Sequence, residues 1–212
     1  MNQIQPFTSV FLLALVSILI FLGLGQRVLD RMRLTDTAAL LILAAMIAGH
    51  FFPTINLGLH LRVNLGSVAL LGIAAYLLLT TSPRESASAL GISLATALLV
   101  VITDKVLPPD PGLLDPVFSA GIFAGLLAYL WNRSRRGAFI AGILGVFLAD
   151  LVAFIQLLVQ GINQPIVLGS GGMFSSAVIC PFLAVFIAEV IGEVREFLHK
   201  GTLTEQGGDD SE

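Results

Sequence analysis

One acidic residue, Asp150, lies inside a long apolar run and is the strongest candidate for chemistry in this sequence. It is the thirteenth of 22 residues in Ala138–Val159, a stretch long enough to cross a bilayer as a helix. A central acid in such a helix costs about 2.5–3.5 kcal/mol, so it needs compensation. The residue type indicates a proton or cation site, or a catalytic carboxyl group kept neutral by burial. The alternative is an acid that only locks helix packing.

A glycine-rich and serine-rich segment precedes the last apolar run and is a second candidate site. Backbone amides at a helix N-terminus bind carboxylate or phosphate groups, and glycine lets a ligand approach the backbone. The segment is neither a P-loop nor a dinucleotide fingerprint, so a tight or re-entrant turn is the alternative. Its candidate residues are Ser170, Gly171, Gly172 and Ser175.

Two sets of landmarks follow the same order along the chain. Ile55-Asn56 precedes Leu65-Gly66-Ser67, and Ile162-Asn163 precedes Leu168-Gly169-Ser170. Asn64 and Ser67 are therefore candidate counterparts of the glycine-rich segment. Polar helix ends that meet at one depth suit a solute site.

No metal or cofactor motif is found. The histidines and acids on one side of the chain have no recognised ligand spacing, and a solvated loop explains them; they are His50, His60, Asp104, Asp110 and Asp115. The single cysteine, Cys180, excludes an intrachain disulfide and a cysteine-built metal site. We therefore expect neither a metal nor a cofactor.

The composition places these residues in a membrane protein. The 212 residues are 56% hydrophobic and only 12% charged, and the mean hydropathy is +0.94. The bilayer is the expected surrounding. A net charge of −3 provides no basic surface for nucleic acid.

The apolar runs predict an all-α, polytopic transmembrane bundle of about seven spans. We expect one transmembrane domain over residues 1–200, with the second, third and fourth spans the shortest. The expected spans are Phe7–Gly25, Thr37–Phe52, Leu65–Thr80, Ala87–Ile102, Leu113–Trp131, Ala138–Val159 and Met173–Ile191.

Arginine and lysine fall mainly in alternate loops, which predicts the topology. Nine lie on one side and two on the other, so we expect an external N-terminus and a cytoplasmic C-terminus in the cell membrane. The polar, acidic segment 201–212 is expected to be a disordered cytoplasmic tail.

The landmarks also suggest two parallel three-helix repeats, 7–81 and 113–192, joined by a linker helix over 87–103. That arrangement occurs in transporters.

Small residues recur at helical spacing in the fifth and sixth runs. They include Gly121, Gly125, Gly142 and Gly145. Such faces let helices approach closely, so we predict tight packing there. The same faces would also permit a homo-oligomer.

The chain resembles a bacterial and archaeal membrane family catalogued as a domain of unknown function, number sixteen-fourteen. The resemblance spans roughly Phe7 to Glu193. It rests on Ile55-Asn56, Val63-Asn64-Leu65-Gly66, Leu148-Ala149-Asp150-Leu151 and Leu168-Gly169-Ser170-Gly171-Gly172-Met173-Phe174. It implies a polytopic membrane protein without an established activity. The family pattern often has an acid at the position that Ser175 occupies here, which weakens a pairing of Asp150 with a second acid.

Three functions remain open. A small-solute or ion transporter or channel is the leading hypothesis, with the lipid bilayer and a small solute or ion as partners. An aspartyl-type intramembrane hydrolase needs two carboxylates, and only Asp150 is placed at mid-depth. A noncatalytic assembly or scaffold protein would use the small-residue faces alone.

Overall fold

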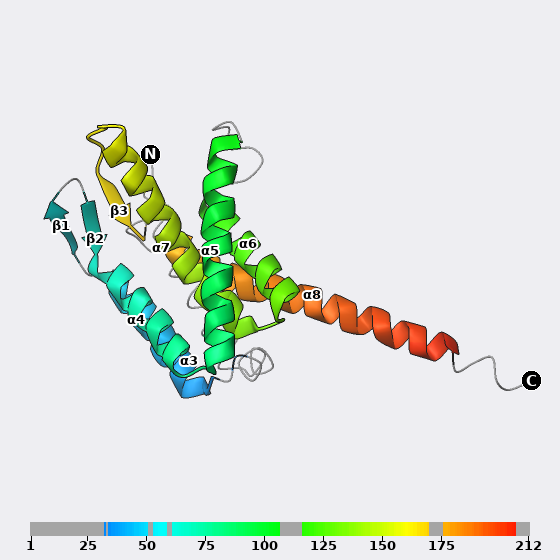
Figure 1. The fold of residues 1–212 in the computed structure, drawn as a ribbon. Helices are drawn as coiled ribbons and strands as arrows, with labels where there is room; N and C mark the ends of the chain where they lie inside the picture. Colours follow the sequence, from blue (N-terminus) through cyan, green and yellow to red (C-terminus); the bar gives the residue numbers. More distant parts are fainter. Residues whose placement is uncertain are drawn as a thin grey trace, which may run out of the picture.

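Helices form most of the described chain in the structure, a computed structural model that describes residues 32, 34–50, 53–58, 61–106, 116–169 and 176–206 (Figure 1). The helices are α3 (Asp36–His50), α4 (Leu65–Leu79), α5 (Pro83–Val106), α6 (Pro116–Trp131), α7 (Arg135–Val159) and α8 (Ser176–Gln206). The strands are β1 (Thr54–Gly58), β2 (Leu61–Asn64) and β3 (Ile166–Leu168).

Three helices are long and apolar enough to cross a membrane: Pro83–Val106, Arg135–Val159 and the Ala177–Phe197 part of α8. The helices α4 and α6 are shorter. The first expected span, Phe7–Gly25, lies outside the described residues. The fourth span is longer than expected, because α5 has 24 residues. It begins at Pro83, since the fixed φ of proline and its missing N–H suit a first helical position.

The prediction that small residues pack helices tightly is confirmed. A Cβ added to Gly142 of α7 would lie 2.6 Å from Cα of Pro181 in α8. A Cβ on Gly125 of α6 would lie 2.7 Å from the carbonyl oxygen of Ala184. The backbones of α6 and α7 therefore touch α8 directly, and α5 approaches α7 where Thr96 meets Gly145.

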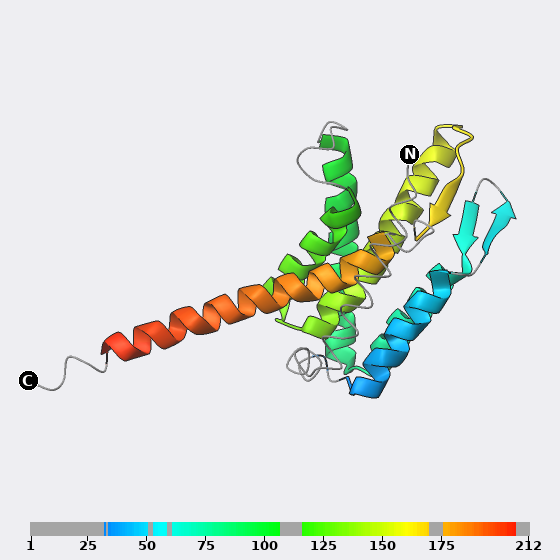
Figure 2. The ribbon, with the colours of Figure 1, turned by 180° about the vertical axis from the view of Figure 1, so that it is seen from behind.

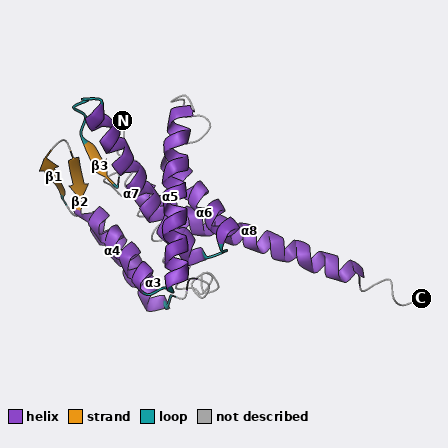
Figure 3. Ribbon diagram, in the orientation of Figure 1, coloured by secondary structure: helices purple, strands orange, loops and turns teal. Residues whose placement is uncertain are grey.

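A three-stranded sheet corrects the all-α prediction. The strands β1 and β2 form an antiparallel hairpin, and β3 pairs with β2 in parallel, with Val63 opposite Leu168. Figure 3 shows the strands together near one end of α4 and of α7. Each strand is too short to stand out from a loop in the sequence. The β2–β3 pair also joins segments far apart in the chain, which a local pattern does not reveal.

The helix α8 projects away from the other helices in two opposite views (Figures 1 and 2). It continues to Gln206, so six residues of the segment expected to be a disordered tail are helical. Residues 207–212 lie outside the described part. Pro181 lies within this helix. Its backbone nitrogen, which carries no hydrogen, is close to Gly142 of α7.

Polar side chains hold the helix ends together at the N-terminus of α7. The guanidinium of Arg136 donates to the carbonyl of Leu77 at 3.1 Å and to the hydroxyl of Thr80, both at the C-terminal end of α4. The hydroxyl of Ser134 caps α7 at Gly137 and also donates to Glu85 of α5. One end of the bundle is therefore a polar, arginine-rich layer. This arrangement agrees with the alternation of charge in the loops, while the orientation in the membrane stays a prediction.

Candidate functional site

The carboxylate of Asp150 meets the backbone just after strand β3. Its Oδ2 accepts a hydrogen bond of 2.8 Å from the amide of Gly169. Among the residues that the structure describes, Gly169 is the only hydrogen-bond donor to this carboxylate. A half-buried acid in an apolar helix is therefore compensated by one backbone donor, and its second oxygen can accept from a ligand.

Gly169 forms the centre of a narrow contact. Its φ is +74°, a left-handed conformation that favours glycine. A Cβ at this position would lie 2.5 Å from Oγ of Ser67 and 2.9 Å from the ring of Phe147. The turn after β3 is thus pressed against α4 and α7, and a hydroxyl group lies beside the residue that donates to Asp150.

Asn64 is the last residue of β2 and stands directly before α4. Its side chain accepts from the amide of Gly66 at 2.7 Å and so caps the N-terminus of α4. Its Nδ2 donates to the hydroxyl of Thr54 in β1. Asn64 is therefore a capping residue whose carbonyl and amide groups are both used.

The parallel pairing of β2 and β3 brings Leu168-Gly169 beside the junction of β2 and α4. Val63 and Leu168 are partners, and Asn64 and Gly169 follow them in the same direction. Of the predicted site residues, the structure places Asn64, Ser67 and Asp150 around this pair. The remaining candidates, Ser170, Gly171, Gly172 and Ser175, lie outside the described residues.

On both helices that carry it, the site lies at a similar distance from the arginine-rich end of the bundle. Arg136 anchors the start of α7 to Leu77 near the end of α4. Asp150 follows Arg136 by fourteen residues, a rise of about 21 Å, and Asn64 precedes Leu77 by thirteen, about 20 Å. Both positions therefore lie about 20 Å along their helices from the arginine-rich end of the bundle.

Asp104 and Cys180, also named from the sequence, donate no hydrogen bond to this carboxylate, while His60, Asp110 and Asp115 lie outside the described residues. Asp104 is an exposed residue near the end of α5. No group of three or more His, Cys, Asp or Glu side chains that could hold a metal ion occurs in the described part of the chain. Cys180 is buried in α8. The site consists of a carboxylate, a hydroxyl group and backbone groups, which suit a proton or a hard cation better than a soft metal.

The strand pair is the part of the site that was not predicted. The residues of β2 and β3, Leu61-Arg62-Val63 and Ile166-Val167-Leu168, are rich in branched aliphatic side chains. Their position at the entry to the two Leu-Gly-Ser segments, with Leu168 shared between β3 and the second segment, was the available signal. The landmarks suggest loops that lead into helices, and the strands lie inside those loops.

No family model, curated protein or solved structure matches this chain. Membership of the membrane family of unknown function therefore stays a prediction.

Replacing Gly169 by alanine should lower the free energy of unfolding by more than the cost of a positive φ alone. A non-glycine residue in a left-handed conformation costs about 1–3 kcal/mol, and the new methyl group would collide with Ser67. Gly161→Ala is the matched control, since Gly161 has φ +68° and nothing within 4 Å of an added Cβ. Thermal unfolding in detergent would compare the two. Equal losses of stability would contradict the close contact at Gly169.

Proposed function

We propose that this protein is a small-solute or ion transporter or channel of the cell membrane, with Asp150 as its proton-binding or cation-binding group. The observation that carries the proposal is the hydrogen bond from the Gly169 amide to Asp150, which brings the non-helical backbone after β3 against α7. Non-helical backbone at membrane depth is tolerated where it is buried in protein or lines a water-filled cavity. Transporter sites commonly combine non-helical backbone with the ends of interrupted helices.

Each residue would have a distinct role at this site. Asp150 would bind the proton or cation through its carboxylate, with the hydroxyl of Ser67 as a neighbouring oxygen ligand. Asn64 would hold the start of α4 in position through its cap. The parallel direction of β2 and β3 favours parallel over inverted repeats, because a two-fold axis along the membrane normal keeps strand directions the same. The proposed topology has an external N-terminus and a cytoplasmic C-terminus.

Ion flux into proteoliposomes tests the proposal. We expect the purified protein to carry protons or sodium ions under an imposed membrane potential, followed with a trapped pH-sensitive dye and with radioactive sodium. Asp150→Asn should reduce this flux to the level of empty liposomes, because the amide carries no charge and cannot bind a proton at neutral pH. Asp104→Asn, at an exposed position on α5, is the control and should leave the flux unchanged. Absence of both fluxes in the unaltered protein would overturn the proposal.

Thiol labelling measures whether water reaches Asp150 and separates the competing functions. Cys180→Ser removes the native thiol, and Asp150→Cys then reports access to a charged thiol reagent in native membranes. Ile155→Cys, on an exposed face of the same helix, should stay unlabelled in lipid, while Gln160→Cys at the helix end should react. Labelling at position 150 without ion flux would favour a hydrolase. Failure to label a folded protein there would favour a packing role in a scaffold protein.

A further inference from the structure

A second polar region, far along α7 from Asp150, surrounds a pocket at the arginine-rich end of the bundle. The pocket has a volume of about 290 Å³, near the lower end of the range for small-ligand sites. Its lining combines an aromatic residue and a glycine with charged side chains from the end of α6, the start of α7 and α8. The lining residues are Tyr129, Arg133, Arg135, Gly192, Arg195 and Glu196.

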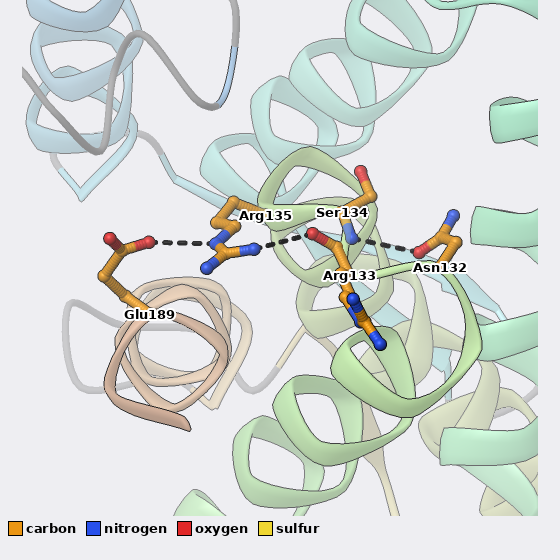
Figure 4. A network of polar contacts seen from close by, with 5 residues as sticks. All are labelled: Asn132, Arg133, Ser134, Arg135 and Glu189. Carbon is orange, nitrogen blue, oxygen red and sulfur yellow. Dashed lines mark hydrogen bonds and ion pairs between the residues drawn. The ribbon is translucent and has the colours of Figure 1, made fainter. Parts of the chain in front are cut away.

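The charge of this lining is positive. Three arginines face one glutamate among the lining residues. Two donors of Arg135 are already used. Its Nε lies 2.9 Å from Oε2 of Glu189, and its Nη1 donates to the carbonyl of Arg133. Figure 4 shows that Arg133 joins these contacts only through its carbonyl group. The guanidinium groups of Arg133 and Arg195 remain the principal donors for a ligand in the pocket.

The backbone at Arg133 is also unusual. Its φ is 55°, the one positive φ among the described residues other than glycine. Such a conformation costs energy and tends to occur at functional sites or sharp turns. Here the turn is held by Asn132, whose side chain accepts from the amide of Ser134 and donates to Ser88 of α5. The position of Arg133 at the pocket is therefore built by contacts from neighbouring helices.

Neighbouring aromatic residues indicate where the pocket lies relative to the bilayer. Tyr129 lines the pocket, and Trp131, 65% exposed, ends α6 beside it. Tyrosine and tryptophan gather at the level of the lipid headgroups. Guanidinium groups recognise phosphate by charge-assisted, two-pronged hydrogen bonds. Basic pockets between helices on the cytoplasmic side of membrane proteins commonly bind anionic headgroups.

We propose that Arg133 and Arg195, with Tyr129 and Arg135, form a binding site for a phosphate-bearing headgroup, supplied by an anionic lipid. The contribution of Arg135 is indirect, since its pair with Glu189 holds α7 and α8 together on two sides of the pocket. This site is independent of the transport proposal and lies at the opposite end of α7 from Val159.

Lipid binding by the full-length protein tests this site. We would measure retention of phosphatidylglycerol and of phosphatidylcholine on the detergent-purified protein by native mass spectrometry, with glycerol phosphate as a soluble third probe. We expect phosphatidylglycerol to bind at least about tenfold more tightly than phosphatidylcholine. The double variant Arg133→Gln/Arg195→Gln should lose that preference. Arg84→Gln, an exposed arginine of α5 at the same end of the bundle but outside the pocket lining, should retain it.

Each result has a defined meaning. Binding of glycerol phosphate that the double variant abolishes would keep the phosphate site and change its source from lipid to solute. Equal retention of the two lipids by the unaltered protein, with no binding of glycerol phosphate, would overturn the proposal. A preference for phosphatidylglycerol that survives in the double variant, or that Arg84→Gln removes equally, would also overturn it. Thermal unfolding of each variant confirms that it is folded before binding is compared.

Discussion

Replacing Glu189 by alanine should lower the free energy of unfolding by about 3–5 kcal/mol, because it leaves a buried charge without its partner. The ion pair joins Arg135 at the start of α7 to the middle of α8, and the two side chains are only 9% and 13% exposed (Figure 4). An exposed pair would contribute about 1 kcal/mol or less. Burial makes the loss of one partner costly, since little water reaches a guanidinium that is 9% exposed.

Denaturation in mixed micelles of increasing dodecyl sulfate content would measure this loss. Glu193→Ala, one turn further along α8 and exposed, is the matched control and should change stability by less than about 1 kcal/mol. The double change Arg135→Met/Glu189→Leu should recover much of the stability, because it removes both charges and leaves apolar side chains of similar size. A small effect of Glu189→Ala alone would mean that the pair is solvated.

Replacing Gly142 by alanine should separate α7 from α8 and destabilise the protein by about 1–3 kcal/mol, because no flexible side chain can yield to the new methyl group. The added Cβ would meet Cα and N of Pro181 at 2.6 and 2.8 Å. Both are backbone atoms, so the two helices themselves must move. Asp150 lies further along the same helix, so its position would shift with α7.

Gly91→Ala provides the comparison for this second change. It lies in the middle of α5, and nothing lies within 4 Å of an added Cβ. There the only effect is the helix propensity of alanine, which stabilises by up to about 1 kcal/mol relative to glycine. Melting temperatures in the same detergent should therefore move in opposite directions for the two variants. A stability of Gly142→Ala equal to that of the unaltered protein would mean that α7 and α8 can separate at little cost.

Much of the helical architecture was predictable, because an apolar run long enough to cross a bilayer can be identified from the local sequence alone. Six of the expected runs overlap α3 through α8, and three of these helices have the length and composition required to cross a membrane. The close approach at Gly142 and Gly125 was also predictable, since small residues at helical spacing form a flat helix surface. Helix ends were less predictable. α5 extends to Val106 through Asp104 and Lys105, because charged residues at a helix end can lie outside the apolar core.

The candidate site was predictable only residue by residue. Asp150 was identified by its charge in an apolar run, and Asn64 and Ser67 by a repeated Leu-Gly-Ser motif. Nothing in the local sequence places these residues together. Ser67 reaches Gly169 because β3 pairs with β2, and the carboxylate of Asp150 reaches the same turn because α7 packs along α4.

The amino-acid sequence alone was enough to predict a helical membrane protein and to single out Asp150 as its strongest candidate for chemistry. Both conclusions follow from the free energy needed to place polar groups in hydrocarbon. That free energy depends on the type of each residue and does not require knowledge of its neighbours. The partners of the polar groups came from the tertiary structure: the Gly169 amide for Asp150, Glu189 for Arg135 and the end of α4 for Arg136. These pairings depend on which helices and strands meet in space, and that depends on the packing of the whole bundle.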